Sequence, residues 1–335
     1  MLFFDATALG EETGGYARYT ERLIAPLAAR VPLTLLHRPQ FAPPAGIAAR
    51  CSPYRKRLLT ELLWLPRAAR AATVLHIPAY AGPVVGLNYR QAVLTLHDAT
   101  QWHGSTGSAR DALYWRTVLP RTLQRVRRIV TDSHAAAAAI AAHDRSLTIK
   151  LRVVYPGVDE LPVGALPPGV PDEPFVLMVG IQPVRKRAAL AVRIAACLPE
   201  VPFVFAGRGA LPPAGNNCRQ VGEVTDAQLG ALYRRAALLL YPSAEEGFGL
   251  PPLEAHLCGC AVVAAPSAAV REVAGEACRF VESADPAVWA DALRELLADG
   301  QARRERAARG AVRAREFTWD AAAEALVAVY RECGL

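Results

Sequence analysis

Residues 241 to 254 read YPSAEEGFGLPPLE. They follow the apolar run from Ala237 to Leu240, whose length is typical of a buried strand. Pro242 and the two glycines predict a loop, and Pro251 and Pro252 suit the opening of a helix. A strand, a glycine loop and a helix start in this order offer unpaired N–H groups and a partial positive charge. Together these favour binding of an anion such as phosphate.

Two carboxylates bracket this loop, Glu246 before the glycines and Glu254 in the predicted first helical turn. Taken singly, a glycine loop is usually a turn, and a Glu at a helix start is usually a solvated partner of the helix dipole. The combination, with seven residues between the two Glu, resembles the signature of the retaining glycosyltransferases of family 4, which have the GT-B fold. That fold is α/β, with two doubly wound Rossmann-like domains facing an interdomain cleft.

The resemblance assigns roles to the residues of this motif. It implies that Glu246 and the loop meet the donor sugar, and that Glu254 holds the ribose hydroxyls of the nucleotide. A carboxylate suits hydroxyls because it accepts hydrogen bonds and donates none. The loop residues in question are Gly247, Phe248, Gly249 and Leu250.

Composition indicates a globular chain with two domains. The chain has 335 residues, of which 52% are hydrophobic and 21% charged. It contains no apolar run of about 18 residues or more and no signal sequence, and its seven cysteines are scattered. This pattern predicts a cytoplasmic protein with reduced thiols.

The formal charge of +7 allows nucleic acid, an anionic membrane or anionic small molecules as partners. Arginines cluster in two helical patterns, and solvated helix faces explain each cluster better than nucleic-acid binding. The clusters are Arg121, Arg125, Arg127 and Arg128, and Arg303, Arg304, Arg306 and Arg309. No interleaved aromatic residues indicate single-strand binding, so we expect no nucleic-acid partner.

Two places in the N-terminal half carry candidate site residues. Gly14 and Gly15 precede a helical pattern from Tyr16 to Leu27, so they predict an anion site at a helix entrance. They resemble the glycine loop that faces the cleft in family 4. Residues 92 to 98 predict a strand with a polar tip, which resembles the family's His-Asp element and places His97 beside the transferred sugar. Asp98 would support the loop, and Asp98, Arg18 and His103 are weaker acceptor candidates.

The segment from Arg55 to Arg70 mixes basic and apolar residues. Leu58, Leu59, Leu62, Leu63 and Trp64 lie on one side of a predicted helix. We expect this side to pack against the N-terminal domain, with contact to a membrane surface as the alternative.

The C-terminal half begins after a linker rich in proline and glycine, residues 161 to 174. The apolar strand 175 to 179 leads to Gly180, and Arg185 and Lys186 follow. Two cations at a strand end suit a diphosphate, and their spacing resembles the family element that neutralises the leaving nucleoside diphosphate. Ile181 stands where many relatives have Arg, so one phosphate contact is in question. By the same resemblance, Gly207, Val221 and Gly222 lie near the nucleobase.

The linker predicts two domains, over residues 1–160 and 161–317. The resemblance to family 4 implies that the first is the acceptor-side domain, that the second binds the nucleotide sugar, and that the helix 318–335 packs back on the first domain. The predicted function is retaining transfer of a hexose from a nucleotide-sugar donor to a glycan or lipid-linked glycan in cell-surface polysaccharide synthesis. The resemblance favours mannose from GDP-mannose, then rhamnose or glucose.

The predicted catalytic residues are His97, Glu246, Arg185 and Lys186. No Asp-x-Asp pair suggests a divalent ion, so we expect neither metal nor cofactor. Two alternatives remain open, a nucleotide-sugar epimerase or sugar phosphorylase on the same fold, and a non-enzymatic basic binding protein. Peripheral contact with the inner membrane face is a further expectation from the resemblance.

Overall fold

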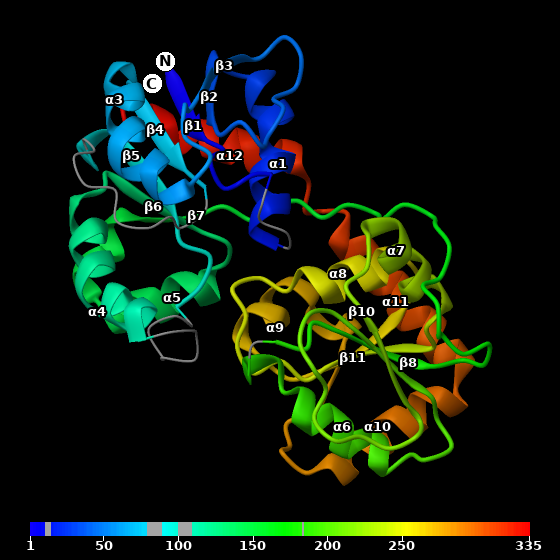
Figure 1. Cartoon of the computed structure of the whole chain (residues 1–335). Helices are drawn as coiled ribbons and strands as arrows, with labels where there is room; N and C mark the ends of the chain where they lie inside the picture. The colour runs from blue at the N-terminus through cyan, green and yellow to red at the C-terminus, as the bar shows by residue number, and fades with distance from the viewer. Residues whose placement is uncertain (11–14, 79–88, 100–108, 183) are drawn as a thin grey trace. The chain divides into compact units, whose positions relative to one another are not determined.

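The computed structural model describes residues 1–10, 15–78, 89–99, 109–182 and 184–335. Its chain divides into two compact units. Unit 1 contains Met1–Gly157 and Phe317–Leu335, and unit 2 contains Val158–Glu316. Unit 2 thus starts at Val158, three residues before the predicted boundary at residue 161. Figure 1 follows the chain through both units in colour.

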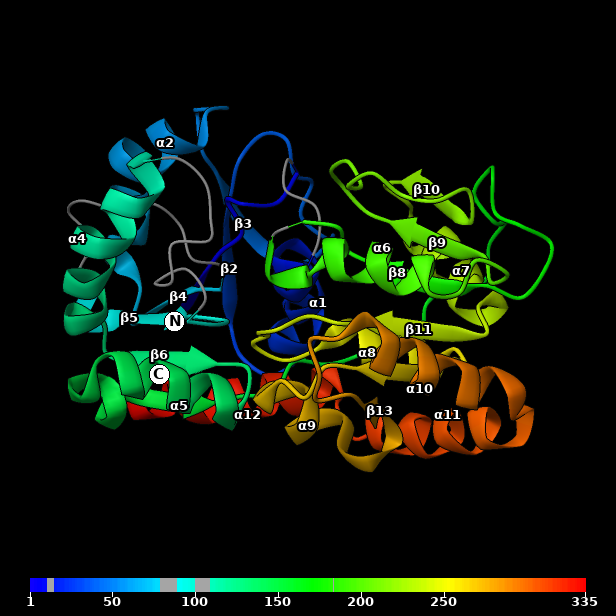
Figure 2. The ribbon, with the colours of Figure 1, turned by 90° about the horizontal axis from the view of Figure 1, so that it is seen from below.

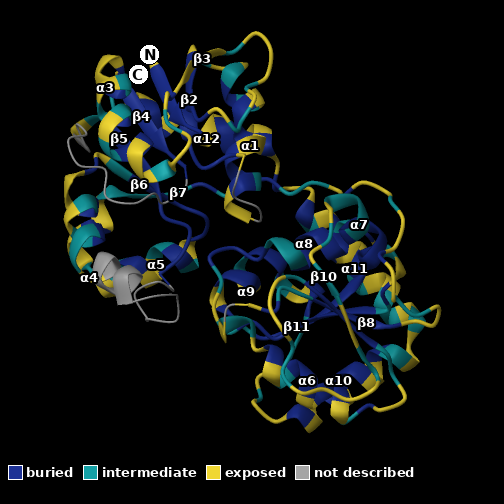
Figure 3. Ribbon diagram, viewed as in Figure 1, coloured by how far each residue is buried: buried dark blue, intermediate teal, exposed yellow. Residues whose placement is uncertain are grey.

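Unit 1 is built on a seven-stranded parallel sheet with the order β3-β2-β1-β4-β5-β6-β7. The strands are short, and most are buried on both faces, as parallel strands covered by helices require (Figure 3). They are β1 (Leu2–Asp5), β2 (Leu33–His37), β3 (Ala48–Cys51), β4 (Val74–Ile77), β5 (Ala92–Thr95), β6 (Arg128–Thr131) and β7 (Leu151–Val153).

Helices cover both faces of this sheet. Its main helices are α1 (Gly15–Ala28), α3 (Leu65–Ala68), α4 (Ala109–Arg125), α5 (His134–His143) and α12 (Trp319–Glu332). Side chains alternate along a strand, so Leu2 and Phe4 face α1 and α12 while Phe3 packs with the α3 segment. Figure 2 shows α12 and α5 running beside β6. The helix predicted from Tyr16 to Leu27 is present within α1, and a parallel sheet with helices on both faces confirms a doubly wound first domain.

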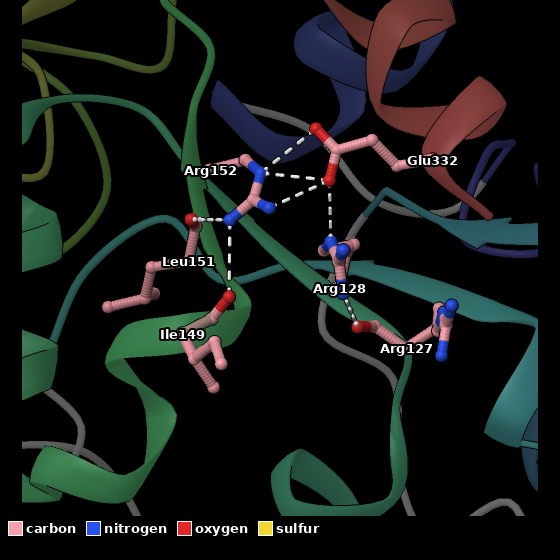
Figure 4. A network of polar contacts seen from close by, with 6 residues as sticks. All are labelled: Arg127, Arg128, Ile149, Leu151, Arg152 and Glu332. Carbon is pink, nitrogen blue, oxygen red and sulfur yellow. Dashed lines mark hydrogen bonds and ion pairs between the residues drawn. The ribbon is translucent and has the colours of Figure 1, made fainter.

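The last helix, α12, is an integral part of unit 1. Its Trp319 lies against Gly157, where any Cβ would overlap the indole and the Trp319 backbone. At the other end of the helix, Glu332 accepts hydrogen bonds from Arg128 of β6 and Arg152 of β7, at distances of 2.7 to 3.1 Å (Figure 4). The helix therefore returns to the sheet that the chain built first.

The segment after β3 departs from the sequence prediction. It is not one helix but a series of short turns: α2 (Arg57–Leu59), a π-helical turn (Thr60–Trp64), α3 and a 3₁₀ turn (Ala69–Ala71). Leu58, Leu59 and Leu63 are exposed, whereas Leu65 is buried. The prediction that this side packs inward was wrong for the three exposed leucines, because a π turn and Pro66 interrupt the regular helix. Trp64, on the same predicted side, does pack against the cluster that contains Leu65.

Unit 2 has a six-stranded parallel sheet with the order β10-β9-β8-β11-β12-β13. Its first strand follows the linker, as the apolar run from residue 175 predicts. The strands are β8 (Val176–Val179), β9 (Phe203–Ala206), β10 (Cys218–Gly222), β11 (Leu238–Tyr241), β12 (Ala261–Ala264) and β13 (Arg279–Phe280).

Two layers of helices enclose this second sheet (Figure 1). On one face α6 and α10 pack around Trp289, and on the other α8 packs against α11. The helices are α6 (Ala188–Ala196), α7 (Asp226–Arg235), α8 (Leu250–Leu257), α9 (Ala268–Ala274), α10 (Pro286–Ala298) and α11 (Gly300–Ala314). The His256 ring of α8 lies directly over Gly310 of α11, so only glycine fits there.

Arginines of α11 bond to the ends of neighbouring helices. Arg303 donates to the carbonyls of Leu296 and Leu297 at 2.6 Å, where α10 ends. Arg306 and Arg313 donate to carbonyls around the end of α9. The last carbonyls of a helix lack internal partners, so these cations satisfy them. Arg303 and Arg306 are therefore partly structural, and the interpretation of the whole cluster as a solvated face was wrong for them.

Candidate functional site

Three glycines line the carboxyl edge of the unit 2 sheet. Gly180, Gly207 and Gly222 end or follow the adjacent strands β8, β9 and β10, and all three have positive φ angles, of 83°, 134° and 72°. The Gly207 N–H donates to the carbonyl of Gly222 at 2.7 Å. A Cβ on Gly207 would lie 3.2 Å from the Cα of Gly180. The edge is thus bare backbone, with Val221 preceding its outermost glycine, and a ligand can approach it closely.

A cluster of two cations and one carboxylate lies beside this edge. Glu246, in the loop after β11, forms ion pairs with Arg185 and Lys186, each at 2.7 Å. Ser243 donates to the same carboxylate at 2.5 Å. The Lys186 ammonium also donates to the Tyr241 hydroxyl at 3.1 Å and lies 4.9 Å from the centre of that ring. The fold therefore brings together three of the four predicted catalytic residues, although Glu246 lies 60 positions after Lys186 in the sequence.

The cations control the protonation of Glu246. Burial by itself would raise the pKa of this carboxyl, but Lys186 and Arg185 outweigh burial and lower the pKa to about 2. The pKa of Tyr241 is raised by burial and by the nearby Glu246. Glu246 is therefore an anion at neutral pH, and Tyr241 remains a neutral hydroxyl beside Lys186.

The start of α8 differs in detail from the prediction. Gly249 precedes the helix with a φ of 114°, and a Cβ there would lie 3.0 Å from Val270. Leu250 opens the helix, but Pro251 and Pro252 follow and supply no N–H groups. The helix start therefore offers fewer amide donors to an anion than its position alone suggests. The loop residues before it, Gly247 and Phe248, are buried.

Glu254 lies on the buried side of α8, as the fifth residue of the helix and not in its first turn. It is 3% exposed, and the Tyr233 hydroxyl of α7 donates to it at 3.4 Å. Tyr233 is a partner that sequence inspection missed, since it belongs to a separate helix 21 residues earlier. The role of Glu254 toward ribose stays a prediction.

In unit 1, His97 is enclosed at the carboxyl edge of the sheet. Its Nδ1 is 2.6 Å from Oδ2 of Asp132, and its Nε2 is 3.0 Å from the carbonyl oxygen of Pro78. The rings of Tyr16 and Tyr19, both from α1, lie within 4.8 Å of the imidazole centre. Burial would lower the pKa of His97, but the charge and hydrogen bond of Asp132, together with Asp98, raise it above its ordinary value.

Asp132 is the functional candidate that the sequence reasoning passed over. It follows β6 just as His97 and Asp98 follow β5, and these strands are neighbours in a parallel sheet. Polar residues at the carboxyl ends of adjacent parallel strands share one edge of the sheet. The run Thr131-Asp132-Ser133 after a predicted strand could therefore have placed Asp132 near His97.

The remaining predicted residues of unit 1 are less defined. Asp98 is buried, Arg18 is half-buried on α1, and the backbone of Gly15 has open space around it. Gly14 and His103 lie outside the described residues. That His97 lies beside a donor sugar bound to unit 2 stays a prediction.

Two further features are absent from the described residues. No group of three or more His, Cys, Asp or Glu side chains in these ranges could hold a metal ion. Within the same ranges no helix is long and apolar enough to cross a membrane. All seven cysteines are free thiols.

Comparison with known families and proteins finds similarity to glycosyltransferases. Residues 173–299, which carry the glycine edge and the cation cluster, match the family described as glycosyl transferases group 1. A D-inositol 3-phosphate glycosyltransferase of Segniliparus rotundus is 31% identical over 61% of this chain and 52% of its own length. The O-antigen chain mannosyltransferase B of Escherichia coli is 28% identical over 79% of this chain and 78% of that protein.

The chain spans about half or less of the length of the inositol-phosphate enzymes, with 23% for the one from Salinispora tropica. Solved structures resemble it along nearly all of its length. Sucrose-phosphate synthase from Thermosynechococcus elongatus has a TM-score of 0.76 at 20% identity, covering 99% of this chain and 98% of that one. HepE from Anabaena, in complex with UDP and glucose, has a TM-score of 0.75 at 17% identity and 99% coverage of both chains. These likenesses establish the fold, which is GT-B.

Proposed function

We propose that this chain is a retaining glycosyltransferase that transfers a hexose from a nucleotide sugar to a glycan or lipid-linked glycan. The observation that carries the proposal is the cluster of Arg185, Lys186 and Glu246 beside the glycine edge of unit 2. That unit contains the region that matches the glycosyl transferases group 1 family.

The cluster suits the departure of a nucleoside diphosphate. Arg185 and Lys186 are 19% and 12% exposed, so they would meet phosphate oxygens in a partly desolvated place where charge stabilisation is strong. Gly180 and Gly207 carry no Cβ, so a diphosphate can approach the main chain closely at these two positions. Stabilising the leaving group as the anomeric bond stretches is the main catalytic work in this proposal. The departing phosphate would take the proton of the attacking acceptor.

Glu246 is assigned to the donor sugar. In the structure its carboxylate pairs with both cations, which are the groups that would bind a diphosphate in this proposal. When the donor binds, the phosphates would replace the carboxylate on at least one cation, which would free Glu246 to accept a sugar hydroxyl. The two carboxylates of the motif are then not the acid and base pair of a glycosidase.

The donor is proposed to be GDP-mannose, followed by a rhamnose or glucose donor. The E. coli relative is named as a mannosyltransferase, which supports mannose, whereas HepE was solved with UDP and glucose, which supports a uridine donor. Thermal-shift measurements with GDP, UDP, dTDP and ADP would separate these cases. A bound nucleotide stabilises the protein by about 2.7 kcal/mol at a hundredfold excess over its dissociation constant.

The proposed reaction is tested by following transfer to an acceptor and the anomeric configuration of the product by NMR. Retention with loss of activity in Lys186→Gln supports the proposal. Three results would refute it: epimerised nucleotide sugar without transfer, release of a sugar phosphate, or salt-sensitive binding of DNA with no affinity for any nucleotide sugar.

We also propose that unit 1 touches an anionic membrane through the segment after β3. Leu58, Leu59 and Leu63 are exposed there, and Lys56 and Arg67 are exposed beside them. The one carboxylate of this segment, Glu61, is buried and paired with Arg57. Sedimentation with vesicles containing an anionic lipid should be lost in a Leu58→Ser, Leu63→Ser double variant. Equal sedimentation of both proteins would disprove this contact.

A further inference from the structure

The environment of His97 dictates its protonation. Both ring nitrogens face oxygen atoms that accept hydrogen bonds, Oδ2 of Asp132 at 2.6 Å and the Pro78 carbonyl at 3.0 Å. A neutral imidazole has one N–H donor and one acceptor nitrogen, so it can satisfy only one of these oxygens. The imidazolium has two N–H donors and satisfies both.

His76, on the adjacent strand β4, provides an internal contrast. Its two nitrogens face the hydroxyls of Tyr330 at 2.6 Å and Thr95 at 2.8 Å. A hydroxyl donates or accepts as needed, so the neutral ring is fully satisfied there. Burial lowers the pKa of His76 to about 3. Two buried histidines of one sheet thus differ in charge, with His76 neutral and His97 a cation, because their partners differ in chemistry.

We infer that Asp132 is a positioning residue that holds His97 as a fixed imidazolium at the carboxyl edge of the unit 1 sheet. Asp132 is buried, and its second oxygen, Oδ1, has no hydrogen-bond partner among the described residues. The carboxylate is therefore not employed in capping backbone N–H groups. Its hydrogen bond to His97 and its charge are its evident contributions.

This arrangement limits what His97 can do in the proposed reaction, on which its link to sugar transfer rests. An imidazolium whose two N–H groups are both engaged cannot accept a proton, so His97 is not a general base. Tyr16 and Tyr19 lie against the ring from the α1 side, and the two hydrogen bonds set its orientation. His97 then acts as a stationary charge, balanced by Asp132.

The pH dependence follows from the groups that face the ring. Among the described residues these are Tyr16 and Tyr19 on α1, His76 on β4, Asp98 after β5 and Asp132 after β6. Burial raises the pKa of Tyr19 and lowers that of His76, so both are uncharged across the neutral range. Asp98 and Asp132 are the two carboxylates, and Asp132 makes the hydrogen bond.

Nitrogen NMR of histidine-labelled full-length protein tests the inference directly. In the wild type, the His97 ring should keep two N–H groups above pH 6.5, the ordinary pKa of histidine. In Asp132→Asn the imidazolium loses its counter-charge, and burial should then move the titration of the ring below that value. Asp5→Asn is the matched control, because Asp5 is also a buried carboxyl at the end of a strand of this sheet. It should leave the His97 signals unchanged.

A wild-type His97 that titrates at or below its ordinary value would overturn the inference, as would an unchanged titration in Asp132→Asn. The wild-type measurement needs no variant, so a misfolded variant cannot hide the answer. It also needs no turnover, so it remains decisive if the proposed glycosyl transfer is wrong.

The kinetic consequence ties the inference to the proposed function. At about pH 8, kcat/KM of Asp132→Asn should fall by about tenfold for each unit by which the substitution lowers the pKa of the ring, since the protonated fraction falls in the same proportion. The loss should shrink as the pH is lowered, whereas a merely structural defect would persist at every pH. A pH-independent loss would overturn the positioning role. Absence of transfer by the wild type itself would refute the proposed function and leave the NMR result standing.

Discussion

Replacing Glu246 by glutamine should separate nucleotide binding from sugar transfer. The Glu246 pKa of about 2, against an ordinary value of 4.5, corresponds to an interaction of about 3 kcal/mol between the carboxylate charge and its surroundings. A diphosphate that takes both cations must compete with this interaction. Glutamine removes the charge and leaves Arg185 and Lys186 without their counter-ion.

The expected gain in affinity for a free nucleoside diphosphate is about tenfold, with about a hundredfold as the upper bound set by 3 kcal/mol. The glutamine oxygen still accepts a hydrogen bond from Lys186, which is why the full gain is not expected. Transfer should fall by at least about a hundredfold, because the same variant loses the charged acceptor assigned to the sugar.

Titration calorimetry with the preferred nucleoside diphosphate measures the first effect, and product formation measures the second. Lys186→Gln should weaken nucleotide binding, since it removes a cation. Glu245→Gln removes the same charge from the preceding, exposed residue and should change neither quantity. If Glu246→Gln binds the nucleotide more weakly than the wild type, as Lys186→Gln does, then Glu246 does not compete with the diphosphate and the reasoning fails.

Three further substitutions test contacts within each unit, one in unit 2 and two in unit 1. Gly310→Ala should lower the free energy of unfolding by about 1–3 kcal/mol in thermal or urea denaturation, because its Cβ would overlap the His256 ring; an unchanged midpoint would show that α8 and α11 can separate freely. Tyr330→Phe should lower the free energy of unfolding by about 1–3 kcal/mol, because it leaves Nδ1 of buried His76 without its partner. An unchanged free energy of unfolding would argue against that hydrogen bond. Glu332→Gln should cost less than about 1 kcal/mol, since the carboxylate is 38% exposed to solvent. The pKa of Glu332 is lowered to about 2 by Arg152 and Arg128, so its small contribution is present at neutral pH and is lost as the pH falls toward that value.

The local arrangement of unit 2 followed from sequence. Neighbours within a few residues fix the apolar strand before Gly180, the strand that ends at Tyr241, the loop between Pro242 and Gly249, and the prolines in the first turn of α8. Backbone conformations of this kind depend on local sterics, so glycine and proline in the sequence predict them. The adjacency of Arg185, Lys186 and the Glu246 loop could be expected because parallel strands end on one edge.

Interactions between distant side chains required the folded chain. That Glu246 pairs with Lys186, that Asp132 faces His97, and that Tyr330 reaches His76 across 254 positions are consequences of strand order and helix packing. The leucines after β3 show the same limit, since their amphipathic pattern is real while the face that is buried was decided by a π turn and a proline. Sequence periodicity says which residues share a side. Only the packing of one element on another says what that side meets, and hence which charges on ionisable groups are stabilised.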